Sequence, residues 1–403
     1  MSTPAPALAP QRVRSAVPLV LGVLLVAANL RPTLTSVGPV LPDLQADLGL
    51  SATGAGVLGA LPLLTFAATA PLVPRLARRL GPEPLMVVSL AVLLAGTVLR
   101  SLSGPAGVFA GTVVLAAGIG AANVLLPVVV KTRMPERVGL VTSWYAATLT
   151  IVAALASGVA VPVAEASAAG WRAALGCWSA LALAALLAWL PAAVRGGRAA
   201  RARRSDGSPT AALGVLPWRS PLAWQVTAFM GLQSLGFYAV VAWLPSLLVD
   251  RGASAAAAGV QLLVLQLAGL LGGLAVPVVL RALPDQRAVA AGGGALFLVG
   301  FAGLALLPGG SWVWTVLVGL GAGCSFTLAL TLLALRSSGA AGAAALSAMA
   351  QSVGYLVAAA GPVAVGALHD ATGGWTAPLL LLVVVAAAQV VAGLGAGRAV
   401  VVR

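Results

Sequence analysis

Residues 41–57 read LPDLQADLGLSATGAGV, and residues 244–260 read LPSLLVDRGASAAAAGV. Ten of these 17 positions are identical at an offset of 203. Two further matches keep nearly the same offset, namely GIGA at 118–121 with GLGA at 319–322 and GW at 170–171 with GW at 374–375. Matches that recur at an almost constant offset along the whole chain indicate two parallel repeats.

The composition excludes an ordinary soluble domain. Of the 403 residues, 60% are hydrophobic and only 8% are charged, whereas about 25% of a soluble domain is charged. The apolar runs are long enough to cross a bilayer, which takes about 20 residues each, and short loops with Gly, Pro and Arg separate them. We therefore predict an all-α membrane protein with twelve transmembrane helices in two six-helix repeats. The predicted spans are 16–41, 53–74, 84–102, 106–130, 138–161, 171–194, 221–248, 254–280, 287–307, 311–335, 340–368 and 375–397.

The repeat divides the chain into three predicted parts. An N-terminal six-helix half occupies 1–194, a cytoplasmic Arg-rich linker 195–219, and a C-terminal six-helix half 220–403. The linker carries six arginines, which make it too polar to span the membrane, and we expect it to be flexible and to rest against anionic lipid. Transporters with two such halves bind their substrate near the bilayer midplane between the halves.

The distribution of basic residues predicts the orientation in the membrane. A net charge of +14 would suggest a nucleic-acid partner in a soluble protein. Here 19 of the 23 basic residues fall in the termini and in the loops on one side of the predicted bundle, while the opposite loops hold only Arg100, Arg172 and Arg251. This bias predicts that both termini lie in the cytoplasm. We expect a multi-pass protein of the inner (plasma) membrane, surrounded by lipid and without a nucleic-acid partner.

The sequence offers no catalytic, cofactor or metal site. It has one histidine and two cysteines, and both cysteines fall in apolar runs without a CxxC pattern. Nucleotide-binding and GxSxG patterns are absent from the sequence. We therefore expect a protein that is not an enzyme, has no cofactor, and uses solute gradients rather than ATP.

The titratable residues leave the coupling ion open. Proton-coupled carriers usually titrate a carboxylate inside the membrane, yet all nine acidic residues are predicted in loops or at helix ends. His369, at the end of the eleventh span, is either an interfacial residue beside Asp370 or a proton relay.

Arg31 is a basic residue predicted inside a span, in the sequence Asn29-Leu30-Arg31-Pro32. A charge in a span costs at least ~2.5 kcal/mol and is retained when something offsets that cost. Pro32 removes one helical hydrogen bond, so the helix is predicted to be irregular here. With no carboxylate predicted at this depth, a guanidinium facing the centre suits a small anion, because its planar fork holds two acceptor atoms. Alternatively, Arg31 extends towards the interface or pairs with Asp43.

Other polar and aromatic residues of the central spans are candidates for the same site. Each could instead serve helix–helix hydrogen bonding or interfacial anchoring. These candidates are Asn123, Tyr145, Gln233, Phe237, Tyr238, Gln351 and Tyr355.

Several stretches resemble one known family. They are NLRPTLTSVGP at 29–39 with Leu-Pro at 41–42, NVLLPVVVK at 123–131, Phe237-Tyr238 with Trp243-Leu244-Pro245, and QSVGY at 351–355 with Gly361-Pro362. Together they resemble the cyanate/nitroimidazole porter family of the major facilitator superfamily. The resemblance implies a twelve-helix carrier for small anions or small polar heterocycles, and it adds Asn29 and Thr35 to the candidate substrate-binding residues. The loop after the second span departs from the superfamily pattern, because Pro74 stands where an aspartate is expected.

We therefore expect a secondary active transporter whose halves rock around a central site, with Arg31 as the anchor of a small, anionic substrate. The functional unit is expected to be a monomer. One alternative is a multidrug-type efflux carrier for neutral amphipathic compounds, in which Arg31 is structural. Another is a membrane receptor or sensor that binds a ligand without transporting it.

Overall fold

The structure is a computed structural model that describes residues 16–102, 104–205 and 216–402. Twelve helical segments within these residues are long and apolar enough to cross a membrane, so the prediction of twelve spans is confirmed. The N-terminal half consists of α2 (Ala16–Asn29), α3 (Pro32–Thr35), η1 (Gly38–Val40), α4 (Leu41–Leu48), α5 (Ala52–Thr69), α6 (Val73–Leu80), α7 (Pro82–Leu102), α8 (Pro105–Arg133), η2 (Pro135–Arg137), α9 (Val138–Glu165), α10 (Trp171–Gly176) and α11 (Trp178–Ser205). The C-terminal half consists of α12 (Pro221–Asp250), α13 (Ala255–Leu280), α14 (Arg287–Leu306), η3 (Pro308–Gly310), α15 (Ser311–Leu335), α16 (Gly339–Thr372) and α17 (Thr376–Ala396).

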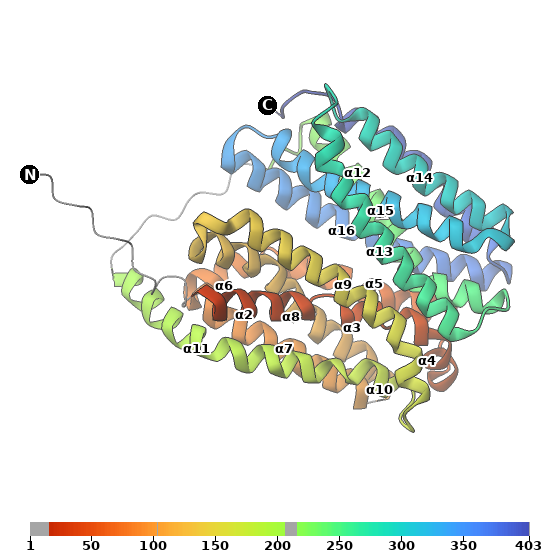
Figure 1. Cartoon of the computed structure of the whole chain (residues 1–403), viewed down its shortest axis with the longest axis horizontal. Coiled ribbons are helices and arrows are strands. Elements are labelled where there is room, and N and C mark those ends of the chain that lie inside the picture. The colour runs from red at the N-terminus through yellow and green to blue at the C-terminus, as the bar shows by residue number, and fades with distance from the viewer. Residues whose placement is uncertain (1–15, 103, 206–215, 403) are drawn as a thin grey trace, which may run out of the picture.

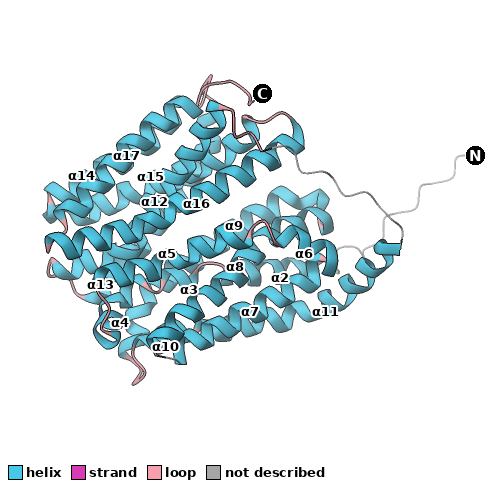
Figure 2. Ribbon diagram, turned by 180° about the vertical axis from the view of Figure 1, so that it is seen from behind, coloured by secondary structure: helices cyan, strands magenta, loops and turns pink. Residues whose placement is uncertain are grey.

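The two halves form separate bundles that lie side by side (Figure 1). Their ribbons are close together at the end of the molecule that carries α4 and α10, and they diverge towards the end where α2 begins and α17 ends, which we call the end of the termini (Figure 2). We call the end opposite the termini the far end. Because consecutive spans alternate in direction, the loops of the molecule gather at these two ends.

Equivalent contacts recur in the two halves. The indole N–H of Trp171 donates to Asp47 at 3.2 Å, and that of Trp375 donates to Asp250 at 2.8 Å. The two aspartates are 203 positions apart in the sequence, and the two tryptophans 204. In each half the contact joins the end of the first span to the start of the sixth. The sequence repeat therefore has a structural counterpart at the far end.

The first span is longer and less regular than predicted. It extends to Leu48, beyond the predicted end at residue 41, because a proline in the first turn can begin a helix and Pro42 begins α4 in this way. Gly49 ends α4 in the left-handed conformation, with φ of 65°. Between α2 and α3, Leu30 and Arg31 are not helical, as expected from the proline at position 32. Arg31 therefore lies at a break within the span.

The sixth span also continues beyond its predicted end. Helix α11 runs to Ser205 and so takes in much of the segment predicted as a flexible linker. Residues 206–215 of that segment lie outside the described residues. Arginine has a good helix propensity, and a helix that has already formed an apolar span extends at little cost into an Arg/Ala-rich stretch.

Contacts between the halves are concentrated at the far end and in the middle of the bundle. The carboxylate of Asp370 in α16 accepts hydrogen bonds from the backbone N–H groups of Ala52 (3.1 Å) and Thr53 (2.7 Å) at the start of α5. In the middle, the side-chain amide of Gln266 in α13 donates to Ser157 in α9 at 2.6 Å and to the carbonyl of Ala153 at 3.1 Å. The Thr53 hydroxyl also donates to the Asp370 carboxylate at 2.6 Å, so within the described residues the side-chain hydrogen bonds across the halves all involve Asp370 or Gln266. These hydrogen bonds tie the halves together at the far end and in the middle, and the residues that the structure describes form none between the halves at the end of the termini.

Glycine permits the closest approach between the halves. A Cβ atom at Gly56 of α5 would collide with the carbonyl oxygen of Pro362 in α16, and one at Gly38 would collide with the carbonyl oxygen of Val241 in α12. Backbones that pack this closely have no room for a side chain between them. These contacts hold the first and second spans against the C-terminal half.

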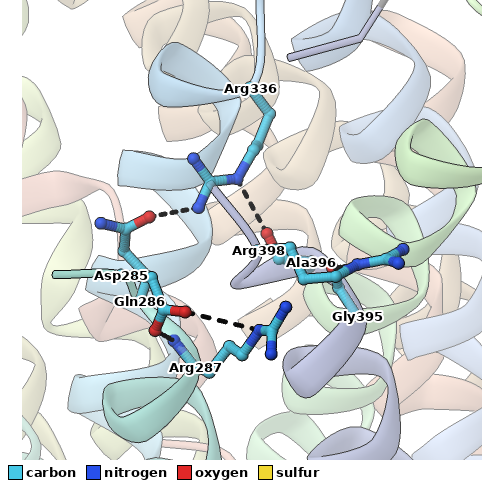
Figure 3. A network of polar contacts seen from close by, with 7 residues as sticks. All are labelled: Asp285, Gln286, Arg287, Arg336, Gly395, Ala396 and Arg398. Carbon is cyan, nitrogen blue, oxygen red and sulfur yellow. Dashed lines mark hydrogen bonds and ion pairs between the residues drawn. The ribbon is translucent and has the colours of Figure 1, made fainter. Parts of the chain in front are cut away.

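A polar network closes the C-terminal half at the end of the termini (Figure 3). Arg336, which follows α15, is only 4% exposed, and it donates to the carbonyl of Ala396 at 2.9 Å and to the side-chain oxygen of Gln286. Burial lowers the pKa of the Arg336 guanidinium, and the nearby Asp285 carboxylate opposes this effect. Arg287 pairs with Asp285 at 3.5 Å on the exposed side of the network. The network therefore joins the ends of α15 and α17 to the start of α14.

Candidate functional site

Arg31 lies at the break between α2 and α3, and its guanidinium faces the C-terminal half. The guanidinium carbon is 5.5 Å from the ring centroid of Phe237 in α12 and 5.9 Å from that of Phe326 in α15. Both distances are within the range of cation–π attraction. Within the described residues, Arg31 makes no ion pair and no side-chain hydrogen bond, so it does not pair with Asp43. Its in-plane N–H donors are therefore available to a ligand.

Two further ring contacts involve predicted residues, and one of them joins the two halves. Tyr355 of α16 and Phe66 of α5 are in edge-to-face contact with 5.8 Å between ring centroids, and Phe237 and Tyr238 are in similar contact at 5.3 Å. The structure thus places Phe237 against Arg31 and Tyr238 against Phe237, while the contact of Tyr355 with Phe66 joins the two halves.

Sequence analysis missed two members of this aromatic set, Phe66 and Phe326. Phe66 belongs to the N-terminal half and Phe326 to the C-terminal half, and neither lies in one of the stretches that resemble the porter family. The scarcity of aromatic residues, 5% of the chain, was a usable signal, because a large ring near the middle of a span is unusual here. It could not indicate which rings face the centre.

Three predicted residues are engaged in packing instead. The side-chain amide of Asn29 is fully buried and donates to the carbonyls of Leu25 (2.8 Å) and Leu181 (3.2 Å) in the N-terminal half. The hydroxyl of Thr35 donates to the carbonyl of Ala153 at 2.9 Å. Gln233 is 2% exposed, and its amide donates to Ser234 at 2.6 Å. All three donate hydrogen bonds inside the bundle, whereas the Oδ1 atom of Asn29 has no partner among the described residues.

Three further predicted residues keep their polar groups available. Asn123 is exposed on α8, and Tyr145 on α9 and Gln351 on α16 are half-buried. None of the three side chains makes a hydrogen bond within the described residues. Gln351 lies one helical turn from Tyr355, so the two side chains share a face of α16. These residues stay candidates for substrate contact.

His369 lies at the far end, away from Arg31. Its ring packs against Trp375 with 4.4 Å between centroids, and its Nε2 is 3.9 Å from the Asp250 carboxylate. It is separated from Tyr355 by fourteen residues of α16, a distance of about 20 Å along a helix. A direct role for His369 at the Arg31 site is therefore not favoured by its position.

The count of basic residues assigned Arg100 to a loop, although the predicted span 84–102 includes it, and the structure places it in the last turn of α7. Its side chain is 1% exposed, and one terminal nitrogen, Nη1, donates to the carbonyl of Thr33 at 2.7 Å. The expectation was wrong because a basic residue near a span end usually reaches the interface, whereas this one turns towards the break in the first span. Thr33 follows Arg31 by two positions, so Arg100 contacts the segment that carries the candidate anion site.

Metal-binding side chains do not gather in the described part of the chain. No group of three or more His, Cys, Asp or Glu side chains there is close enough together to hold a metal ion. The chemistry that the site offers is therefore that of one cation, several aromatic faces and neutral polar groups.

Comparisons with known proteins agree with this architecture. Residues 22–362 match the sequence profile of the Major Facilitator Superfamily. The 2-nitroimidazole transporter of Escherichia coli (strain K12) is 41% identical over 380 residues, covering 94% of this chain and 95% of that protein. The cyanate transport protein CynX of the same organism is 30% identical over 359 residues, covering 89% and 91%.

A solved transporter structure shares the fold. The crystal structure of a D-xylose–proton symporter aligns with a TM-score of 0.74 at 15% sequence identity, covering 96% of this chain and 98% of that one. With twelve spans and bacterial transporters as relatives, the protein is a multi-pass protein of the inner membrane. The family profile covers most of the chain, and two transporters resemble it over nearly their whole length, so the chain belongs to the Major Facilitator Superfamily of membrane transporters.

Proposed function

We propose that the protein is a secondary active transporter for a small anion or small polar solute, with Arg31 as the anchor of the substrate. The observation that carries this proposal is that the Arg31 guanidinium lies within a span without a carboxylate partner. It lies at a break in the first span, has no carboxylate partner among the described residues, and rests against aromatic rings of the opposite half. A cation that costs free energy in a membrane and has no permanent partner is suited to a transient one.

The geometry around Arg31 favours a flat substrate with two acceptor atoms. A guanidinium that lies over a ring uses its face for the cation–π contact, so its in-plane N–H groups can still form two parallel hydrogen bonds to an anion or a nitro group. The rings of Phe237, Tyr238 and Tyr355 would form the walls around a conjugated solute. Asn123, Tyr145 and Gln351 would provide neutral polar contacts.

Alternating access follows from the division of the site between the halves. Arg31 belongs to one half, whereas Phe237 and Phe326 belong to the other. A substrate between them would contact both halves, and its binding free energy would favour the state in which the halves are closest. With both termini in the cytoplasm, as the distribution of basic residues predicts, the structure corresponds to an inward-facing state that is closed at the far end.

Uptake into proteoliposomes tests the role of Arg31. We expect Arg31→Ala to reduce uptake of labelled cyanate and labelled 2-nitroimidazole, the solutes named for two relatives, by at least about tenfold. Arg31→Lys should also transport poorly, because an ammonium cannot offer the two-point contact. The matched control is Arg172→Ala, since Arg172 is half-buried at the far end and pairs with Asp47 there, away from Arg31.

Three results would contradict the proposal. If Arg31→Ala transports both solutes at the rate of the unmodified protein, Arg31 is not the anchor. If the protein exports neutral lipophilic dyes and neither solute competes, the efflux alternative is favoured. If the solutes bind but do not accumulate in the vesicles, the protein is a receptor or sensor. Membrane insertion of each variant is verified by its amount in purified membranes.

A further inference from the structure

Arg100 is a buried cation that the proposed transport role does not use. It is 1% exposed inside α7, and two of its nitrogens, Nε and Nη2, have no hydrogen-bond partner among the described residues. The third, Nη1, donates to the carbonyl of Thr33 at 2.7 Å. A buried charge with one hydrogen bond and no counter-ion costs more in desolvation than that bond returns. The buried Arg100 is therefore better explained by the segment around Thr33 that its hydrogen bond holds in place than by a gain in stability.

The carbonyl that Arg100 contacts is one that the broken helix leaves without its regular partner. In a continuous helix, the Thr33 carbonyl would accept from the N–H of Val37, but that N–H instead bonds to Leu34 at 3.4 Å. Helix α3 contains only four residues, Pro32–Thr35, which is too short to keep its own orientation in isolation. The bond from α7 supplies a fixed point for this segment.

Tight packing against α8 fixes the position of the turn of α7 that carries Arg100. A Cβ atom at Gly111 of α8 would collide with the backbone of Arg100, so α8 lies directly against this turn of α7. On its other side, the break is held at Thr35, whose hydroxyl donates to Ala153 of α9. The segment is thus tied to α7 at Thr33 and to α9 at Thr35.

From these contacts we infer that Arg100 is a positioning residue for the substrate site. Through the Thr33 carbonyl, it holds the break in the orientation that presents the Arg31 guanidinium to Phe237 and Phe326. Arg100 carries the same charge as Arg31 and cannot neutralise it, so the anchor keeps its full attraction for an anion. This inference rests on the proposed function only in treating Arg31 as the anchor.

Transport kinetics in proteoliposomes provide the first test. Arg100→Met removes the donor but retains an unbranched side chain, and we expect it to raise the KM for labelled cyanate about tenfold or more while the maximal rate changes little. Arg100→Lys can still donate to the Thr33 carbonyl and should keep a KM within about threefold of the unmodified protein. The control is Ser101→Ala, because Ser101 is buried next to Arg100 and its hydroxyl bonds only within α7.

Hydrogen–deuterium exchange without any substrate provides the second test. We expect the amides of residues 33–37 to exchange faster in Arg100→Met than in the unmodified protein, and to be unchanged in Arg31→Ala and Ser101→Ala. This measurement does not depend on Arg31 binding a solute, so it separates a failure of this inference from a failure of the proposed function. Unchanged exchange at 33–37 in Arg100→Met would overturn the inference. The inference would also be overturned if Arg100→Lys raised the KM as much as Arg100→Met does. The same holds if the maximal transport rate of Arg100→Met fell while its KM stayed constant.

Discussion

Arg31 and Arg100 are both buried to some degree in the N-terminal half, but their guanidinium groups have different surroundings. Arg31 has aromatic rings on its face and no bonded acceptor among the described residues. Arg100 has one backbone acceptor and is closed off from solvent. The first is able to exchange a water shell for a substrate, whereas the second is able only to hold its neighbour. We therefore assign binding to Arg31 and positioning to Arg100.

Loss of the ring next to Arg31 is expected to weaken substrate binding. A cation–π contact contributes about 0.5–2 kcal/mol, so Phe237→Leu should raise the KM of an anionic solute by a factor of about 2–30 with little effect on membrane insertion. Phe237→Tyr keeps the ring face and should remain close to the unmodified protein. Initial rates of cyanate uptake over a range of concentrations measure both. A KM that is the same for the leucine and tyrosine variants would show that the ring does not act on Arg31.

The first span is broken at a proline, although prolines elsewhere lie inside continuous helices. Pro32 interrupts the first span and Pro42 starts its last helix, so one membrane crossing is made of several short pieces. The C-terminal half has a hydrogen-bond network at the end of the termini. In this network Arg336 bonds to the end of α17 and to Gln286 before α14 (Figure 3). Here a buried guanidinium donates to one carbonyl, that of Ala396, at the end of a helix that would otherwise lack a partner there.

Removal of the Arg336 side chain is expected to destabilise the C-terminal half. Arg336→Met leaves the buried carbonyl of Ala396 without its donor, which should lower the free energy of unfolding by about 1–3 kcal/mol. Arg287→Met is the matched control, because its ion pair with Asp285 is largely exposed and such pairs contribute about 0–1 kcal/mol. Thermal unfolding of the purified proteins in detergent, followed by tryptophan fluorescence, compares the two. Equal melting temperatures would contradict the role given to the buried network.

The α5–α16 and α9–α13 interfaces between the halves are related by the sequence repeat, but different hydrogen bonds hold them together. Between α5 and α16, the carboxylate of Asp370 caps the first N–H groups of α5 at the far end, where a negative charge is favoured by the helix dipole. Between α9 and α13, the contact is the buried amide of Gln266 near the middle. Both must break for the far end to open, so they help to set the population of the described state.

Removal of the Asp370 carboxylate is expected to open the far end more often. In a background with Cys177 and Cys324 replaced by serine, a cysteine introduced at the buried Ala55 of α5 should react severalfold faster with a hydrophilic maleimide in Asp370→Ala. Glu165→Ala is the matched control, because Glu165 ends the equivalent helix α9, is exposed, and makes no hydrogen bond within the described residues. Equal labelling rates in the two variants would argue against a closing role for Asp370.

The sequence by itself determined the twelve spans, the two-half organisation suggested by the repeat at 41–57 and 244–260, and a charge in the first span at Arg31. These features depend on local composition over about 20 residues, which is what insertion into a bilayer responds to. The direction of each side chain was decided only by the tertiary structure. Asn29 and Gln233 turn into the bundle, and Arg100 reaches the first span instead of a loop. The rotation of a helix about its axis depends on packing against helices distant in sequence, and in a chain that is apolar on nearly all sides no local pattern specifies that rotation.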